Sequence, residues 1–397
     1  MKLTTLEKEM LEGKYGKAAR KSMEILSTLG EIFNADCMVD VVGVQIAGVS
    51  YDNLGEAGLE FLNDMAGDGK VRVLTTLNPA GMDRENWKAL GIDEDFATNQ
   101  NRVIEAFAKM GIITTCSCTP YLIGNSPHFG QHLAWAESSA VCYANSVIGA
   151  RTNREGGPSA LASAITGKTP NYGYHIDTNR HGEVFFSVNS PINGTNEFGL
   201  LGKIIGDKLV KVGKKIPYIT GITSATLEEL KSFCASVATY GGTALFHMED
   251  ITPEYDRYPI PQKLKFEIQQ TDLNNTKTEL TDTDIEVDFV SIGCPHASIY
   301  EIAQIANLLK GKKVNKEFWI TTARPTKRLA DEAGYSKIIE DAGAKFAADT
   351  CCVVSPIKGR FKGMMVDSAK ACYYGRSKNK FNVKIGSIEE CIKEATE

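Results

Sequence analysis

The segment Val287-Asp-Phe-Val-Ser-Ile-Gly-Cys-Pro-His296 is typical of a buried strand that ends at a reactive side chain. Its apolar run stops at Gly293, where the backbone can approach a bound group closely, and Pro295 directs the chain away from the strand. In open α/β sheets the carboxyl ends of the strands form the ligand crevice. The segment therefore predicts a sheet that presents the thiol of Cys294 at its ligand-binding edge.

Two more cysteines follow apolar runs in the same way. Cys118 comes shortly after the run Gly111-Ile-Ile-Thr-Thr-Cys116, and Cys351 comes directly after Ala347-Ala-Asp-Thr350. Because strand ends converge on one crevice, we expect these two thiols and that of Cys294 to meet around one ion or cluster. The pattern predicts a three-thiolate metal site.

Cysteine is among the most buried residue types, so each thiol taken alone is more often a packing residue than a ligand. Cys116 is an alternative to Cys118, and Cys352 is an alternative to Cys351. No Cys-x-x-Cys pair occurs, which argues against a zinc ribbon, a thioredoxin-type redox site and a ferredoxin-type cluster. The cysteines that we assign to the core are Cys37, Cys142, Cys234, Cys372 and Cys391.

Helical and strand patterns alternate along the chain, which predicts an α/β fold with a mixed or parallel sheet. Helices are expected from Thr4 to Gly13 and from Ala18 to Leu29, the second ended by Gly30. The polar stretch from Gln269 to Asp284 reads as a surface loop or a lobe boundary, with Ile216 as the other possible boundary. Strands are expected at Val71–Leu77, Ile112–Thr115, Glu183–Val188, Pro217–Ile222, Thr243–Met248, Ile285–Ile292 and Phe318–Thr322.

The composition is that of an ordinary globular chain of two or three lobes, with 397 residues, 43% of them hydrophobic and 23% charged. No apolar run reaches the roughly 18 residues that a membrane span needs. The formal net charge of -5, without a basic cluster, argues against nucleic-acid binding. Acidic residues within Met1-Lys-Leu-Thr-Thr-Leu-Glu-Lys-Glu-Met10 argue against an export signal, so we expect a cytoplasmic protein with reduced thiols.

Six segments spread over nearly the whole chain carry a family pattern. They are Gly48-Val-Ser-Tyr-Asp-Asn-Leu-Gly55, Thr75-Thr-Leu-Asn-Pro-Ala-Gly-Met-Asp83, Cys116-Ser-Cys-Thr-Pro-Tyr121, Glu137-Ser-Ser-Ala-Val-Cys-Tyr-Ala-Asn-Ser-Val-Ile-Gly-Ala-Arg-Thr-Asn153, Gly293-Cys-Pro-His296 and Ala348-Asp-Thr-Cys351. Together they resemble the large, catalytic part of the aconitase X family, in particular its archaeal type. The resemblance implies an aconitase-like, multi-lobed, three-layer α/β architecture with largely parallel sheets.

The resemblance also implies the residues of the site. An iron-sulfur cluster, expected to be of the 4Fe-4S type with one open iron, would be held by Cys118, Cys294 and Cys351. Glu137 and Ser138 are implied as catalytic residues. The substrate-binding residues that the resemblance implies are Gly48, Val49, Ser50, Asn78, Pro79 and Lys370.

Several of these residues also have a purely structural explanation. Glu137 and the serines that follow it could cap or begin a helix. His296 could be a hydrogen-bonded structural residue, a donor to a cluster sulfur or a general acid. Scattered cations usually lie on solvated faces, so Arg151, Arg154 and Lys370 are weak candidates for phosphate binding.

The function implied by the resemblance is the dehydration of (R)-5-phosphomevalonate to trans-anhydromevalonate 5-phosphate in a modified mevalonate route to isoprenoids. The alternatives are dehydration of cis-3-hydroxy-L-proline and, in another class, a metabolite-binding protein with a structural metal. Expelling hydroxide and forming an enolate-like transition state both need electrophilic help, which an open iron supplies. The family also uses a small swivelling domain with a serine loop, which we expect here as a separate partner subunit.

Overall fold

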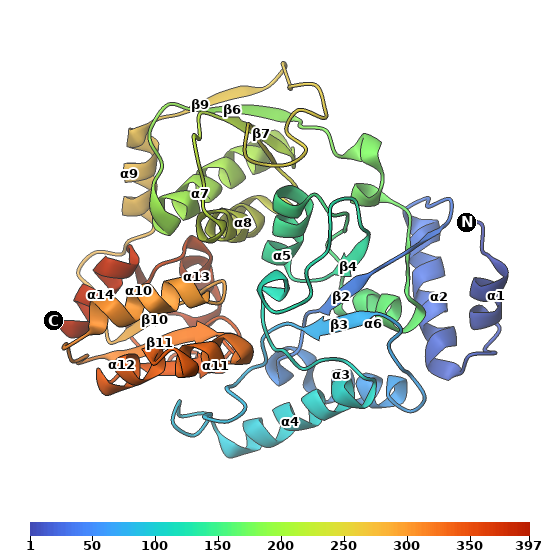
Figure 1. Ribbon diagram of the computed structural model, residues 1–397, viewed down its shortest axis with the longest axis horizontal. Coiled ribbons are helices and arrows are strands. Elements are labelled where there is room, and N and C mark those ends of the chain that lie inside the picture. Colours follow the sequence, from blue (N-terminus) through green and yellow to red (C-terminus); the bar gives the residue numbers. More distant parts are fainter.

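The computed structural model describes all 397 residues and arranges them in three regions, each built on a parallel sheet (Figure 1). The first region runs from α1 to β5, the second from β6 to α9 and the third from β10 to α14. Helices pack against the sheets, as parallel strands joined by crossover helices require. The α/β fold class and the largely parallel sheets predicted from the sequence are confirmed.

The first region contains a three-stranded sheet of order β3-β2-β4 and a separate antiparallel pair, β1-β5. Its strands are β1 (Met38–Asp40), β2 (Gly43–Ile46), β3 (Leu74–Leu77), β4 (Leu133–Trp135) and β5 (Lys168–Pro170). Its helices are α1 (Thr5–Leu11), α2 (Lys17–Ile32), α3 (Tyr51–Met65), α4 (Glu94–Lys109), α5 (Ser138–Tyr143) and α6 (Gly157–Thr166).

The second region has a four-stranded sheet of order β8-β7-β6-β9, and the third a five-stranded sheet of order β12-β11-β10-β13-β14. The second comprises β6 (Val184–Val188), α7 (Gly194–Val212), β7 (Pro217–Thr220), α8 (Leu227–Gly241), β8 (His247–Met248), β9 (Lys265–Ile268) and α9 (Gln270–Glu279). The third comprises β10 (Phe289–Ile292), α10 (Ile299–Leu309), β11 (Glu317–Thr322), α11 (Arg324–Glu332), α12 (Tyr335–Asp341), β12 (Lys345–Ala348), β13 (Gly363–Val366), α13 (Ala369–Tyr374), β14 (Asn382–Ile385) and α14 (Ile388–Thr396).

One predicted helix end and one predicted loop are wrong for physical reasons. α2 continues through Gly30, which is buried, and a Cβ atom there would lie 2.5 Å from the sulfur of Met1. Glycine at this position permits close packing and does not stop the helix. The polar stretch from Gln269 to Asp284 is not a loop but contains α9, which begins with a capping box and buries its one apolar side chain, Leu273. The alternative of a lobe boundary in this stretch stays a prediction.

Most strand predictions are right in place but too long, whereas the predicted strand Phe318–Thr322 is one residue shorter than β11. The expected strand at Ile112–Thr115 is reduced to a single bridge between Ile113 and Thr76. The expected strand at Thr243–Met248 contains only the two residues of β8. Ile216 directly precedes β7, which pairs with β6 in one sheet, so this position lies inside the second region. Apolar runs marked these places because buried loops next to strands are apolar as well.

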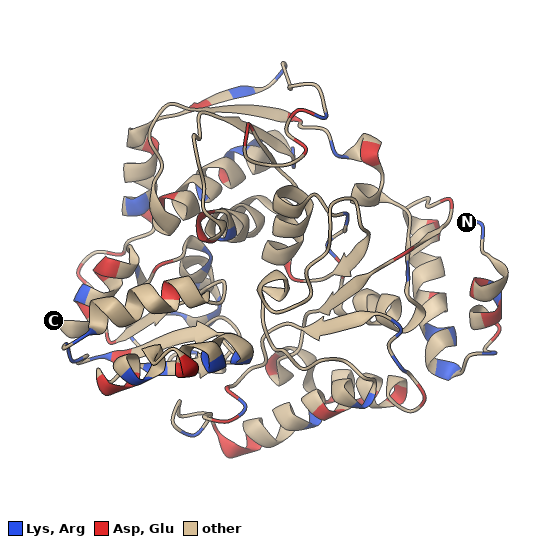
Figure 2. Ribbon diagram, in the orientation of Figure 1, with Lys and Arg blue, Asp and Glu red and all other residues tan.

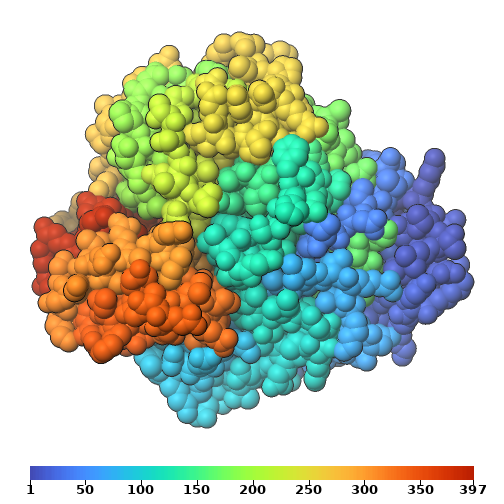
Figure 3. All heavy atoms as spheres, in the orientation of Figure 1, coloured from blue at the N-terminus to red at the C-terminus, as the bar shows by residue number.

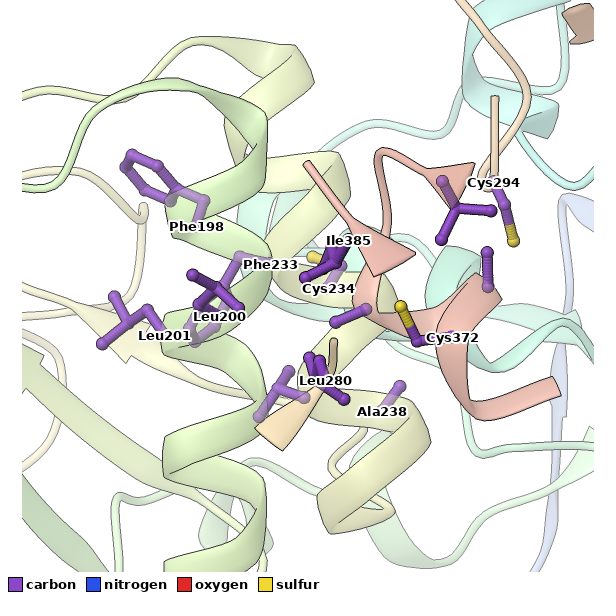
Figure 4. Packing of buried hydrophobic residues seen from close by; sticks show 14 of the residues in the cluster. Phe198, Leu200, Leu201, Phe233, Cys234, Ala238, Leu280, Cys294, Cys372 and Ile385 are labelled. Carbon is purple, nitrogen blue, oxygen red and sulfur yellow. The ribbon is translucent and has the colours of Figure 1, made fainter. Parts of the chain in front are cut away.

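The second and third regions share one hydrophobic core, in which α7 and α8 pack together (Figure 4). A Cβ atom at Gly202 of α7 would lie 2.8 Å from the carbonyl oxygen of Phe233, so glycine is needed where the two helices cross. The cluster continues from Phe198 and Phe233 to Cys294 and Cys372 of the third region. The predicted ligand Cys294 is therefore anchored at the edge of the largest apolar cluster.

Figure 2 shows basic and acidic residues interspersed along the outer helices of this view. The three regions pack directly against one another around the middle of the face shown in Figure 3. No helix of the chain has the length and apolar character to span a membrane.

Candidate active site

The strands of the first sheet end at a common edge. β2 is parallel to both β3 and β4, so their carboxyl ends lie side by side. β2 leads into Gly48–Ser50, β3 into Asn78–Pro79 and β4 into Glu137–Ser138. Gly48 has φ +80° with open space around its missing Cβ atom, which leaves the backbone accessible. Every residue that the family resemblance assigned to the substrate, except Lys370, thus comes from one sheet edge.

The third sheet presents its own edge. Its order β12-β11-β10-β13-β14 places two strands that are far apart in sequence, β10 and β13, next to each other at its topological switch point. Ligands bind at this point in open α/β sheets, outside the carboxyl ends of the strands. Cys294 follows β10, Lys370 lies in the first turn of α13 just after β13, and Cys351 follows β12.

A buried ion pair joins the two edges. Lys370 Nζ donates to Glu137 Oε1 at 2.5 Å, and only 9% and 11% of the two side chains are exposed. Asn78 Nδ2 donates to Glu137 Oε2 at 2.9 Å, and the Ser139 hydroxyl donates to Oε1 at 2.9 Å. Glu137 is also the N-cap residue of α5, so the structural explanation is confirmed, and its catalytic role stays a prediction. Ser138, beside it, does not take part in these bonds and is half-buried.

Electrostatics keep this pair charged. Burial alone would raise the pKa of Glu137, but the Lys370 charge and the hydrogen bonds from Lys370, Asn78 and Ser139 lower it to about 2. Burial lowers the pKa of Lys370, but Glu137 and the thiols of Cys294 and Cys118 outweigh it and raise the value. The site therefore offers an ionised carboxylate and an ammonium side by side in a desolvated position.

The three predicted cysteine loops are gathered around His296. The His296 N–H donates to Cys118 Sγ at 3.2 Å. Nδ1 of its ring lies 3.1 Å from Ser117 Oγ, and Nε2 lies 2.9 Å from the carbonyl oxygen of Thr350. Since Cys294 is two residues before His296, the loops of all three cysteines meet at this imidazole. Burial lowers the pKa of His296 to about 4, so the ring is neutral.

The thiols are buried and free of disulfides. Burial raises the pKa of Cys118 to about 12, and the Glu137 charge adds to the rise while Lys370 opposes it. Burial also raises the pKa of Cys294 and Cys351, and N–H groups of Val353 and Val354 oppose the rise at Cys351. Such thiols stay protonated unless a cationic centre binds them.

The alternative thiols have other surroundings. Cys116 packs in the apolar core of the first region. The side chain of Ser291 contacts the Cys352 thiol and opposes the rise of its pKa that burial causes. No three His, Cys, Asp or Glu side chains are close enough to hold a single metal ion. The absence of such a group argues against a closed zinc site. It does not argue against a cluster, because the thiolate ligands of a cluster lie further apart than those of a single ion. The thiols of Cys118, Cys294 and Cys351 influence one another's pKa electrostatically, so they lie near one another, as the ligands of a cluster would.

The comparisons with known proteins agree with this geometry. Sequence models of the aconitase X first, second and third domains match residues 1–178, 182–282 and 287–397. The chain belongs to the aconitase X family. The crystal structure of Thermococcus kodakaraensis aconitase X in its holo-form superposes on it with a TM-score of 0.92 and 44% identity, and the match covers 100% of both chains. The aconitase-like architecture is therefore confirmed.

Curated relatives of this aconitase X chain are dehydratases. The phosphomevalonate dehydratase large subunit of Methanocaldococcus jannaschii is 46% identical over 99% of this chain and 100% of its own length. That of Thermococcus kodakarensis is 45% identical over the full length of both. The cis-3-hydroxy-L-proline dehydratase of Hypocrea jecorina is 30% identical over 99% of this chain, which covers 68% of that protein.

One residue of the aconitase X site was missed in the sequence. Gln100 of α4 is fully buried, and its Nε2 donates to the Val49 carbonyl oxygen at 3.0 Å. Its Oε1 accepts from the N–H groups of Tyr51 at 3.1 Å and Gly81 at 2.9 Å. The amide thus connects the loops after β2 and β3. The signal was a polar residue on the apolar stripe of α4, three residues after Ala97 and three before Val103.

A second residue that sequence analysis missed connects the first and third sheets of this aconitase X protein at their carboxyl edges. Arg324, after β11, donates to Asp349 Oδ2 at 2.7 Å and also to Asp83 in the loop after β3. Asp83 in turn accepts from the N–H group of Ala348 at 2.9 Å. The first and third regions are therefore connected by a buried ionic network beside the Cys351 loop.

The three cations considered for phosphate binding lie in different places. Arg151 is buried and donates to Asp177 at 2.6 Å and to Glu254 at 3.2 Å, so it is engaged away from the strand ends. Arg154 is exposed and lies near Gly242, beside the second region. Arg154 bridges to Trp135 at the carboxyl end of β4, but its side chain lies near Gly242. Of the three candidates, only Lys370 pairs with Glu137.

Proposed function

We propose that the chain is the large subunit of an iron-sulfur hydro-lyase that dehydrates (R)-5-phosphomevalonate to trans-anhydromevalonate 5-phosphate. The observation that carries the proposal is its 43% to 46% identity to four archaeal proteins named phosphomevalonate dehydratase large subunit. These matches cover 93% to 100% of those proteins. Two cis-3-hydroxy-L-proline dehydratases, at 29% and 30% identity, support that reaction as the second candidate.

The thiols of Cys118, Cys294 and Cys351 would hold the cluster, which we take to be of the 4Fe-4S type. Three thiolate ligands leave one iron open, and that iron supplies the Lewis acidity that the loss of hydroxide needs. The convergence of the three loops on His296 supports this assignment. Lys370 lies close enough to act on the Cys294 and Cys118 thiols electrostatically, which favours their ionised forms.

The residues of the chain would bind and orient the substrate. The Lys370 ammonium offers a positive charge to an anionic substrate next to the ionised Glu137. The Oδ1 atom of Asn78 is buried and has no hydrogen-bond partner within the chain, so a substrate hydroxyl can donate to it. Ser138, half-buried beside Glu137, adds a hydroxyl that can donate or accept. We therefore assign contacts with the reacting groups to Glu137 and Ser138.

The loops after β2 and β3 would form the wall opposite the cysteines. Gly48 and Val49 present backbone groups, and the absence of a side chain at Gly48 allows a close approach. Ser50 donates to the Val354 carbonyl oxygen at 3.3 Å, which connects this loop to the chain after Cys351. Pro79, next to Asn78, keeps the second loop in an extended course.

A separate small subunit would complete the enzyme. The archaeal relatives are named large subunits, which supports a partner chain, and we propose that this partner is a swivelling domain whose serine loop takes part in proton transfer. With a pKa of about 2, Glu137 is a weak base in this state, so a proton acceptor from elsewhere is needed. We propose a cytoplasmic heterodimer.

The test is anaerobic co-purification with the candidate small subunit, followed by assay on (R)-5-phosphomevalonate and on cis-3-hydroxy-L-proline. We expect iron and sulfide in the protein, turnover of phosphomevalonate with net loss of water by proton NMR, and little turnover by the large chain alone. Turnover of hydroxyproline alone would favour the second candidate. A colourless protein without sulfide and without turnover of either compound would support a non-catalytic metabolite-binding protein.

A further inference from the structure

The cysteine loops are held by a residue that the proposed reaction does not use. His296 contacts the loop of Cys118 twice, through its own N–H group at Cys118 Sγ and through Nδ1 at Ser117 Oγ. It contacts the loop of Cys351 through Nε2 at the Thr350 carbonyl oxygen. The residue itself belongs to the loop of Cys294. One side chain therefore cross-links three segments that lie more than 50 residues apart in the sequence.

The hydrogen-bond partners define what the ring can do. The carbonyl oxygen of Thr350 only accepts, so Nε2 of His296 carries the hydrogen in this contact. Nδ1 then accepts from the Ser117 hydroxyl, which also lies 3.1 Å from Thr119 Oγ1. Both ring nitrogens are used by protein groups, and the side chain is completely buried. Neither nitrogen is left to exchange a proton with a substrate.

A residue of the second region also contacts His296. Lys231 of α8 donates to the His296 carbonyl oxygen at 3.0 Å and forms a buried ion pair with Glu301 of α10. Glu301 also accepts from the N–H group of Ser298, two residues after His296. The loop that carries Cys294 and His296 is thus fixed on one side by the core and on the other by the two remaining cysteine loops.

We propose that His296 is a positioning residue that sets the mutual placement of the three thiols, and thereby the retention and the spectroscopic properties of the cluster they hold. The inference rests on the proposed function, because it presumes a cluster. It assigns no catalytic step to the imidazole. Outer hydrogen-bond partners of metal ligands typically change metal affinity by roughly tenfold to a hundredfold when they are removed.

The test compares four variants of the full chain, isolated anaerobically with its small subunit. His296→Leu removes both ring bonds, and His296→Gln keeps a donor that can reach Thr350. Ser117→Ala removes the Nδ1 partner together with the two bonds between Ser117 and Thr119. His247→Leu is the matched control, because His247 is equally buried and bonds to the Arg180 carbonyl oxygen away from the cysteine loops. The measurements are iron and sulfide per chain, the visible and EPR spectra, the rate of iron release to a chelator and the melting temperature.

We expect His296→Leu to release iron at least about tenfold faster than the unmodified protein, with an altered EPR spectrum. The rates of iron release of His296→Gln and Ser117→Ala should lie between those of His296→Leu and the unmodified protein. His247→Leu should lower the melting temperature but keep the spectrum and the release rate. If His296→Leu does not fold, Ser117→Ala and His296→Gln decide, since each leaves a ring bond between position 296 and Thr350 possible.

Unchanged spectra and release rates in the His296 and Ser117 variants of an iron-loaded protein would overturn the positioning role and leave the proposed dehydratase intact. Equal loss of iron in His247→Leu would also overturn it, because the effect would then follow general destabilisation. An unmodified protein that contains neither iron nor sulfide would overturn the proposed function and the inference together.

Discussion

The two walls of the candidate site are built in different ways. The loops after β2, β3 and β4, which we propose to face the substrate, come from one small parallel sheet, and the buried amide of Gln100 connects two of them. The cysteine loops come from two regions: Cys118 from the first, and Cys294 and Cys351 from the third. The first wall therefore depends on local sheet geometry, whereas the second depends on how separate regions pack. Changes to the cysteine wall should affect iron, and changes to the other wall should affect substrate.

The largest effect is expected on the cysteine wall. Cys294→Ala removes one of the three thiols, so the cluster should be lost and turnover should fall by at least about 1000-fold, because several kcal/mol of Lewis-acid stabilisation disappear. Iron per chain and turnover on phosphomevalonate measure this. Cys391→Ala is the control, since Cys391 is equally buried but lies in α14 and should keep its iron. Full iron content in Cys294→Ala would remove that residue from the ligand set.

The second effect tests the ion pair that joins the two walls. Glu137→Gln leaves Lys370 buried without a counter-charge, so the unfolding free energy should fall by about 3 kcal/mol and turnover should drop strongly. Chemical denaturation measures the first. The double variant Glu137→Gln with Lys370→Met should recover stability but not turnover. Glu56→Gln is the control, because its pair with Arg102 is largely exposed and should contribute little to stability.

The third effect is the loss of folding stability at low pH. The pKa of Glu137 is lowered to about 2 from an ordinary value of 4.5, so its carboxylate stabilises the fold fully above the higher value. This contribution, roughly 3 kcal/mol, is lost as the pH falls from about 5 towards 2. The stability difference between the unmodified chain and Glu137→Gln should therefore shrink in that window. A difference that stays constant down to pH 2 would show that the carboxylate is not held by Lys370.

The smallest effect is expected on the substrate wall. Gln100→Leu removes the three bonds to Val49, Tyr51 and Gly81, so the loops should loosen. KM should rise by at least about tenfold, which the loss of three hydrogen bonds of about 0.5 kcal/mol each would produce. Iron content and the cluster spectrum should not change. Thr98→Leu, on the exposed face of the same helix, is the control. Loss of iron in Gln100→Leu would contradict the separation of the two walls.

Much of this arrangement was readable in the sequence because strand ends have a local signature. An apolar run that stops at glycine or proline, as before Cys294, marks the carboxyl end of a strand. In a parallel sheet that end faces the ligand crevice, so Cys294 and Cys351 could be placed at one edge. Element lengths were less accurate, because buried loops such as Thr243–Leu245 are as apolar as strands. The polar composition of α9 likewise hid a helix that buries only a few side chains.

The sequence by itself determined the α/β class, the family and the residue types that stand at the strand ends, since each of these follows from patterns within a few consecutive residues. Only the tertiary structure decided that Glu137 pairs with Lys370, that Gln100 connects two substrate loops and that His296 joins three cysteine loops. These contacts link segments many tens of residues apart. They depend on strand order and on the packing of separate regions, and neither of these leaves a periodic trace in the chain.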